Sequence, residues 1–292
     1  MATSLTAGGG GQTLVTLRDE GRRERRFVAY APSGAVKLST SRADLDVGES
    51  RVRLLPDGRY HVSAKARGAD GTGEVAIVDL IVTPQARAYF PGASLGGGIV
   101  SGYAVPALRA EASGSICTGG TCEQFTAAQA YHDHNWGVWR GVTWDWGASR
   151  AGQYAFLYGR VYPADTSASI PPVLVYLVDS LGFRAVFRPR LISYEDERSI
   201  RLGANVLRVP SGATFFDARG EDTLRVDISI EDAIATDTRP RRTGSDGDRG
   251  DPLGTAKAHP YFIQMKGTVR ISGRLDGTPL VGIGTGFFET YR

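Results

Sequence analysis

The sequence predicts an all-β protein, and three observations support this class. Short segments in which apolar and polar residues alternate recur along the 292-residue chain, as in strands with one buried face. Turn residues separate these segments at Pro56-Asp57-Gly58 and Asp70-Gly71, and the 38 glycines suit many turns and few helices. No long stretch shows the period of about 3.6 residues that marks a helix. We therefore expect an antiparallel β-meander.

Taken in order, the segments predict short strands in the first half and longer strands in the second. The first half contains residues 13–18, 26–30, 50–55, 60–66 and 74–83. The second half contains residues 152–162, 173–178, 184–194, 223–230, 261–274 and 279–291. Because so many strands must close or stack to hide their edges, the length fits two tandem β-barrel domains.

The domain boundaries follow from composition. Residues 1–11 end in four glycines and are expected to form a flexible leader. The first barrel would then span residues 12–127 and the second residues 128–292. Within the second, residues 236–260 form a polar run that we interpret as a long mobile loop.

Composition excludes some classes of function. With 41% hydrophobic and 22% charged residues, the chain is typical of a soluble globular protein. The net charge of +3 is spread along the sequence, so a nucleic-acid surface is not indicated. No window reaches the roughly 18 apolar residues that a membrane helix needs. The oligomeric state is not readable from the sequence.

The two cysteines, Cys117 and Cys122, bracket a short hairpin turn that contains Gly119-Gly120. A disulfide across this turn is geometrically plausible, and two reduced thiols are the alternative. A bonded pair would favour a secreted or periplasmic protein. Reduced thiols would favour the cytoplasm, which we slightly prefer.

The most unusual stretch is residues 131–137, Tyr-His-Asp-His-Asn-Trp-Gly. Half of the four histidines and all four tryptophans lie between positions 132 and 146. On an extended strand, one face would carry His132, His134 and Trp136, and the other would carry Tyr131, Asp133 and Asn135. We take this stretch as the candidate site.

Three interpretations of its histidines stay open. His132 and His134 could bind a metal if His61, His259 or a carboxylate supplied a third ligand, although we assign no metal site. They could belong to a buried hydrogen-bonded network that only stabilises the fold. Alternatively, His134 and Asp133 could exchange protons with a substrate, with pKa values shifted by apolar surroundings.

Aromatic and basic residues nearby could complete a binding site. The four tryptophans could wall an apolar pocket and stabilise a carbocation, or they could be ordinary packing: Trp136, Trp139, Trp144 and Trp146. Four arginines could anchor an anionic group or form surface ion pairs with Asp145, Asp179 and Glu195: Arg140, Arg160, Arg184 and Arg188.

Residues 131–137, the glycine-rich approach at residues 91–106 and residues 282–289 together resemble the carotenoid hydratase (hydroxyneurosporene synthase) family and its AttH-like relatives. The resemblance covers the chain from about residue 12 onward in strand order. It implies two lipocalin-like antiparallel β-barrels, a ligand pocket beside the His-Trp strand, and hydratase or cyclase activity without a cofactor. Carried over by position, the motif marks Asp133, His134 and Trp136.

Two departures from the family pattern bear on this expectation. Such hydratases place a tyrosine and an acidic residue on the following strand, whereas this chain has Tyr158-Gly159-Arg160, with Asp165 only after Pro163. The match also begins late, so we expect the first barrel to be incomplete or differently closed.

The sequence therefore predicts a cofactor-independent biosynthetic enzyme that binds a hydrophobic polyene, terpenoid or polyketide and promotes its cyclisation, isomerisation or hydration. Catalysis is assigned to Asp133, His134 and Tyr158. Substrate binding is assigned to Tyr131, His132, Trp136, Trp139, Trp144, Trp146 and Arg160. A non-catalytic carrier of a lipid or pigment is the alternative.

Overall fold

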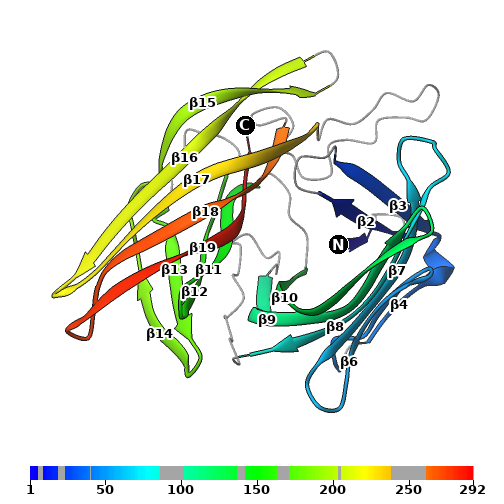
Figure 1. Cartoon of the computed structure of the whole chain (residues 1–292), viewed down its shortest axis with the longest axis horizontal. Coiled ribbons are helices and arrows are strands. Elements are labelled where there is room, and N and C mark those ends of the chain that lie inside the picture. Colours follow the sequence, from blue (N-terminus) through cyan, green and yellow to red (C-terminus); the bar gives the residue numbers. More distant parts are fainter. Residues whose placement is uncertain are drawn as a thin grey trace. The chain divides into compact units, whose positions relative to one another are not determined.

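The computed structural model (Figure 1) describes residues 1–5, 9–18, 24–39, 41–85, 102–136, 142–163, 171–202, 205–237 and 261–291. These residues form β-strands joined by turns, with one 3₁₀ turn and no α-helix among them. Within the described ranges, no helix could cross a membrane. The predicted all-β class is confirmed.

The chain divides into two compact units. The first comprises Met1–Gln85 and Arg109–Tyr131, and the second comprises Ala86–Leu108 and His132–Arg292. Two long strands, β9 (Gly102–Thr118) and β10 (Thr121–Trp136), contribute residues to both units. The stretch His132–Trp136 is therefore part of the second unit.

The first unit contains one antiparallel sheet. Its shorter elements are β1 (Ala2–Leu5), β2 (Gly11–Leu17), β3 (Arg25–Ala31), the 3₁₀ turn Ser33–Ala35, β4 (Val36–Leu38), β5 (Leu45–Val47), β6 (Ser50–Leu54), β7 (Tyr60–Gly68) and β8 (Val75–Pro84). Strand β8 lies between β7 and β9, and β9 pairs with β10. The other edge of β7 pairs first with β6 and then with β3.

The predicted turns explain why the chain reverses where it does. Gly58 and Gly71 have φ angles of 84° and 77°, a left-handed backbone conformation that glycine adopts at no steric cost. Between such turns, alternating residues of β7 and β8 point into a small core that includes Ala64, Ala66 and Val78.

The N-terminal residues differ from the expected leader. Residues 2–5 form strand β1, which pairs antiparallel with β2 from Ala2 opposite Leu14 to Leu5 opposite Gly11. Backbone hydrogen bonding can extend a sheet edge without an apolar pattern, so composition alone did not reveal this strand.

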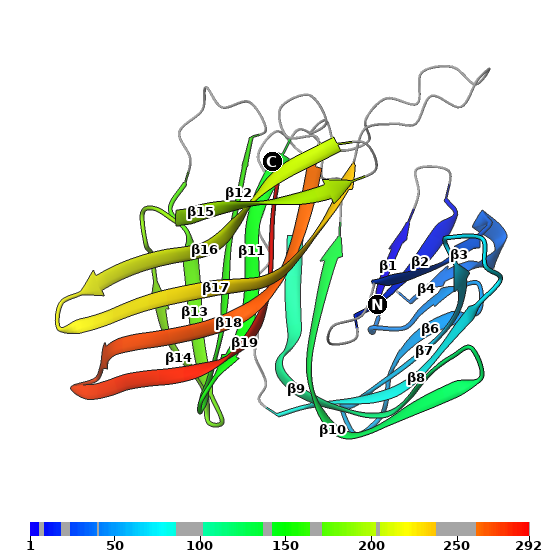
Figure 2. The ribbon, with the colours of Figure 1, turned by 45° about the horizontal axis from the view of Figure 1, so that its top comes forward.

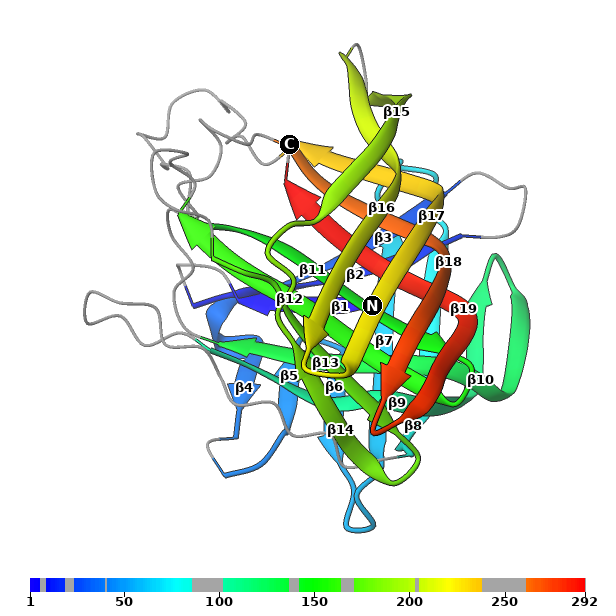
Figure 3. The same cartoon turned by 90° about the vertical axis from the view of Figure 1, so that its left-hand side faces the viewer.

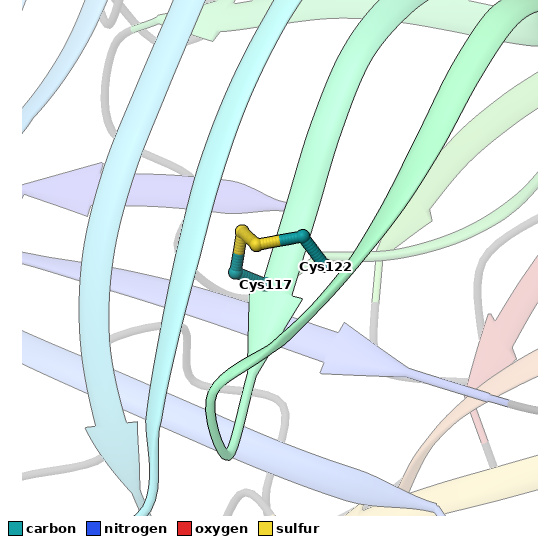
Figure 4. Close-up of a disulfide and its surroundings, with 2 residues drawn as sticks. All are labelled: Cys117 and Cys122. Atoms are coloured by element: carbon teal, nitrogen blue, oxygen red, sulfur yellow. A yellow bond between two sulfur atoms is a disulfide. The ribbon is translucent and has the colours of Figure 1, made fainter.

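The structure joins Cys117 and Cys122 in a disulfide across the β9–β10 hairpin (Figure 4). Gly119 and Gly120, which form the turn, have φ angles of 55° and 83°. The bonded alternative is therefore the one that the structure contains. Nearby, the Arg25 guanidinium donates hydrogen bonds to Thr118 and Glu74 and so ties β3 to the same hairpin.

The second unit contains one curled nine-stranded antiparallel sheet (Figure 2 and Figure 3). Its strands are β11 (Val142–Ala151), β12 (Tyr154–Pro163), β13 (Leu174–Asp179), β14 (Gly182–Phe187), β15 (Ser193–Leu202), β16 (Asn205–Arg219), β17 (Asp222–Asp237), β18 (Tyr261–Leu275) and β19 (Thr278–Tyr291). Their spatial order is β14-β13-β12-β11-β19-β18-β17-β16-β15. The C-terminal strand β19 therefore lies between β11 and β18.

One face of this sheet carries the unit's hydrophobic core. Alternate residues of each strand point into it, among them Phe156, Leu177, Val226, Ile271 and Phe288. We call this the core face and its reverse the second face. Of the expected mobile loop, residues 238–260 lie outside the described residues.

Candidate functional site

Strands β11, β12, β18 and β19 place polar side chains on both faces of the second unit's sheet. Trp146 lies opposite Gly159 on β12 and opposite Glu289 on β19, and Glu289 lies opposite Gln264 on β18. Residues directly opposite one another in a sheet share a face, so this row lies on the second face. Their chain neighbours, such as Asp145 and Thr290, lie on the core face.

On the second face, Glu289 is held between two neutral donors. The Trp144 indole Nε1 donates to Glu289 Oε2 at 3.3 Å, and the Gln264 Nε2 donates to Glu289 Oε1 at 3.1 Å. We call Trp144, Gln264 and Glu289 the Glu289 cluster. Among the described residues, no arginine or lysine pairs with this carboxyl group.

The surroundings of Glu289 favour its protonated form. Burial raises the pKa of Glu289 from 4.5 to about 7. The hydrogen bond from Gln264 lowers the pKa, the charge of Asp133 raises it, and the hydrogen bond from Trp144 lowers it. A carboxyl group with this pKa can both give and take a proton near neutral pH.

Aromatic rings pack together at one side of the Glu289 cluster. The rings of Trp144 and Tyr291 meet edge to face with centroids 4.9 Å apart, and Phe262 lies 5.1 Å from Tyr291 and 5.9 Å from Trp144. Rings in such contact form an apolar wall whose faces can stabilise a nearby positive charge.

Trp146 and Tyr103 form a second aromatic pair on the same face. Trp146 is 7% exposed, and its ring meets Tyr103 of β9 edge to face at 4.8 Å. A Cβ atom at Gly159 would lie 2.7 Å from Trp146 Cε3, so the glycine makes room for the indole. Burial, followed by the charge of Tyr176 and a hydrogen bond with it, raises the pKa of Tyr103, which therefore stays protonated.

The predicted stretch on β10 approaches this site through Asp133. Asp133 is partly buried, and its charge acts on Glu289. His132 is also partly buried, and burial followed by the charge of His134 lowers its pKa from 6.5 to about 4. His134 is exposed, and Tyr131 is partly buried in the first unit. The side chain of Trp136 and all of Trp139 lie outside the described residues.

The core face carries a different carboxylate cluster directly behind the first. Asp145 is 1% exposed and accepts three hydrogen bonds: Arg160 Nε donates to Oδ2 at 2.7 Å, while Tyr194 and Thr290 hydroxyls donate to Oδ1 at 2.6 and 2.7 Å. Only 9% of the Arg160 side chain is exposed. We call these four residues the Asp145 cluster.

Tyr158 lies in the core and not beside the tryptophans. It is 1% exposed, its ring contacts Phe215 and Phe288, and a Cβ atom at Gly147 would lie 2.3 Å from it. Because side chains alternate along β12, Tyr158 and Arg160 share the core face while Gly159 faces Trp146. The structure thus does not bring Tyr158 or Arg160 to the face that carries Trp144 and Trp146.

The other predicted arginine contacts have separate outcomes. Arg160 pairs with Asp145 inside the core and not at the surface. Arg184 pairs with Asp179 at 3.5 Å. The Arg188 backbone amide donates to Asp217, and Arg140 lies outside the described residues.

The metal interpretation finds no support in the described ranges. The His61 ring Nε2 contacts Asp79 Oδ1 at 2.7 Å in the first unit, and His259 lies outside the described residues. Where the structure describes the chain, no group of three His, Cys, Asp or Glu side chains could hold a metal ion.

Sequence reasoning missed Glu289 as a site residue, although the residues that carry the family resemblance included it. A single carboxylate within Phe287-Phe288-Glu289-Thr290-Tyr291 was the available signal, because charged residues are rare in buried apolar strands. Gln264, Phe262 and Tyr291 were missed for lack of any local signal.

No protein-family model and no curated protein matches the chain. Among solved structures, it is similar to an AttH-like protein from Nitrosomonas europaea, with a TM-score of 0.61 and 18% identity over 97% of this chain and 82% of that one. It is also similar to kievitone hydratase from Nectria haematococca, with a TM-score of 0.55 and 13% identity over 97% of this chain and 84% of that one.

These similarities show a shared fold. They confirm the predicted class of two tandem lipocalin-like antiparallel β domains, and an AttH-like protein is among the relatives that the sequence resemblance indicated.

Proposed function

We propose that this chain is a cofactor-independent enzyme that binds a hydrophobic small molecule on the second face and hydrates, cyclises or isomerises it by proton transfer at Glu289. A polyene, terpenoid or polyketide is the substrate class that suits aromatic surroundings with an acidic group. The fold is that of a protein named as a hydratase, which supports the proposal as an analogy of fold.

The observation that carries the proposal is the environment of Glu289. Its pKa of about 7 matches the pH at which a general acid or base is most effective. Apolar surroundings are a known means of raising the pKa of a carboxyl group so that it can act as a general acid near neutral pH.

The neighbouring rings suit the charge that such a step creates. Protonation of an alkene gives a carbocation, which aromatic faces such as Trp144 stabilise by on the order of 1 kcal/mol or more when water is excluded. Deprotonated Glu289 could then activate a water molecule that adds to the carbocation, or remove a proton from the carbocation. Binding a flexible chain in a folded conformation would lower a cyclisation barrier further.

In this proposal the residues of β10 assist Glu289. Asp133 contributes a negative charge that favours the protonated acid, and His134, exposed next to it, remains a candidate proton carrier. His132 is neutral at physiological pH and is suited to hydrogen bonding a polar group of the ligand.

Incubation with a panel of polyenes and isoprenoids in D₂O tests the proposal. An enzyme of this type returns molecules that have gained water or exchanged hydrogen for deuterium, whereas a carrier returns the ligand with its mass unchanged. Glu289→Gln should lower turnover by about a hundredfold or more, the usual contribution of a general acid. Glu123→Gln, at an exposed position of the first unit, is the matched control and should retain full turnover.

A panel that returns unchanged from the wild-type protein while binding tightly would assign the carrier function instead. Equal turnover in the Glu289→Gln and Glu123→Gln variants would remove Glu289 from the mechanism.

A further inference from the structure

Strands β11 and β19 are joined differently along their length. Their backbone pairing runs from Ala151 opposite Gly284 to Trp146 opposite Glu289, and among the described residues it ends there. Beyond this point β11 continues alongside β12, while β19 continues alongside β18. The Trp144–Glu289 hydrogen bond therefore joins the last paired residue of β19 to a residue of β11 that lies just beyond the end of the pairing.

On the core face, a side-chain hydrogen bond spans the strands at this same point. Thr290 Oγ1 donates to Asp145 Oδ1 at 2.7 Å, and both side chains are 1% exposed. Thr290 follows Glu289 and Asp145 follows Trp144 in the chain, so the two cross-strand contacts share their strands and lie on opposite faces.

Asp145, to which Thr290 donates, is itself held in place by two other hydrogen bonds. Arg160 on β12 and Tyr194 on β15 donate to the same carboxylate, so its position is set from two further strands. Burial and the charge of Asp145 raise the pKa of Tyr194, which keeps its hydroxyl a donor at all physiological pH values. Hydrogen bonds to a buried carboxylate are short and strong and hold their geometry well.

We infer that Thr290, through its bond to Asp145, is a positioning residue that sets the contact between Trp144 and Glu289 on the reverse face of the sheet. The inference rests on the proposed function for its catalytic consequence but not for its geometric content. Reactive groups lose efficiency when they move by about 0.5 Å, so a supporting bond of this kind affects chemistry without touching substrate.

Thr290→Val tests this role, because valine has the shape of threonine without its hydroxyl. The Trp144 donor should move away from Glu289, which removes a bond that stabilises the charged carboxylate. The midpoint of the Glu289 titration should then rise by about one pH unit. Thr290→Ser keeps the hydroxyl and should restore the wild-type midpoint.

Two measurements test the inference, and the first of them does not depend on the proposed function. The first is the Trp144 emission maximum at fixed pH, obtained by subtracting the spectrum of Trp144→Phe, and it should shift in Thr290→Val whatever role Glu289 has in catalysis. The second is the pH dependence of kcat, which should move upward while KM changes little.

The outcomes distinguish the positioning role from the proposed function. A shifted Trp144 emission in Thr290→Val together with full activity of Glu289→Gln would support the positioning role and overturn the proposed function. Unchanged Trp144 emission and an unchanged titration midpoint in Thr290→Val, even with lowered stability, would show that the bond only supports the fold and would overturn the inference.

Discussion

Two carboxylates lie back to back in the second unit's sheet, and their partners differ. Asp145 on the core face meets an arginine and two hydroxyl groups, all within 2.7 Å. Glu289 on the second face meets an indole and an amide at 3.1 Å or more, and among the described residues it meets no cation. A cation therefore compensates the negative charge of Asp145, whereas among the described residues no cation compensates a negative charge on Glu289.

The difference separates a structural role from a chemical one. A guanidinium partner and short hydrogen bonds hold the buried Asp145 carboxylate in place and make it costly to disturb. Burial raises the pKa of Glu289 to about 7, and the hydrogen bonds from its two neutral donors, which lower the pKa, offset this only in part. Because side chains alternate between the two faces along a strand, neighbouring residues such as Glu289 and Thr290 can have a chemical role and a structural role.

The largest expected effect comes from removing the cation of the Asp145 cluster. Arg160→Leu leaves Asp145 buried without its ion pair and also removes the contact of the guanidinium with the Tyr162 ring. We expect the free energy of unfolding to fall by about 3–5 kcal/mol. Urea denaturation followed by far-UV circular dichroism measures this loss.

Two control variants test whether loss of the Arg160–Asp145 ion pair causes the fall in stability. Arg208→Leu breaks an exposed ion pair with Glu197 at 3.3 Å and should cost about 1 kcal/mol or less. Combining Arg160→Leu with Asp145→Asn removes the uncompensated charge and should restore much of the stability. A cost for Arg160→Leu no larger than that for Arg208→Leu would contradict the structural role of the Asp145 cluster.

A smaller effect concerns the pH dependence of the free energy of unfolding, to which Glu289 contributes. The folded-state pKa of Glu289 is about 7, above its ordinary 4.5, so the folded protein binds this proton more tightly than the unfolded chain does. Stability from this group is therefore fully present below about pH 4.5 and is lost as the pH rises towards about 7. Glu289→Gln cannot titrate, so its stability relative to wild type should increase across that window.

The comparison with Glu289→Gln is needed because His132 acts in the opposite direction. Its pKa falls from 6.5 to about 4 on folding, so its contribution is present above about 6.5 and is lost as the pH falls through about 4. His132 is common to both proteins and cancels in the difference. Parallel stability curves for the two proteins would mean that Glu289 titrates as an ordinary exposed carboxyl group.

Local patterns in the sequence were sufficient to predict the class of fold. Alternation and turn glycines such as Gly58 act over a few residues, and they predicted strands that the structure contains. The edge strand β1 was missed because its pairing with β2 depends on backbone hydrogen bonds, which any polar sequence can make.

The site was predicted less completely, because it depends on the register between distant strands. Alternation showed that Trp144 and Trp146 share a face, but only the pairing of β11 with β19 brings Glu289 beside them, 143 residues later in the chain than Trp146. The same register places Tyr158 behind the sheet. Such pairings are set by global packing, so no short window of sequence contains them.

The smallest expected effect concerns Asp133, which the sequence suggested as a proton donor. Its charge raises the pKa of Glu289, but burial is the larger cause, so Asp133→Asn should lower the pH midpoint of turnover by less than about one unit. His134 is not among the groups that shift the pKa of Glu289, and His134→Ala should leave the midpoint in place.

Measuring kcat against pH distinguishes two roles for Asp133. If it acts only through its charge, the profile moves and its maximum stays; if it donates the proton itself, the maximum falls by about tenfold or more, and the contrast between the two carboxylates of the sheet becomes secondary to the chemistry of β10.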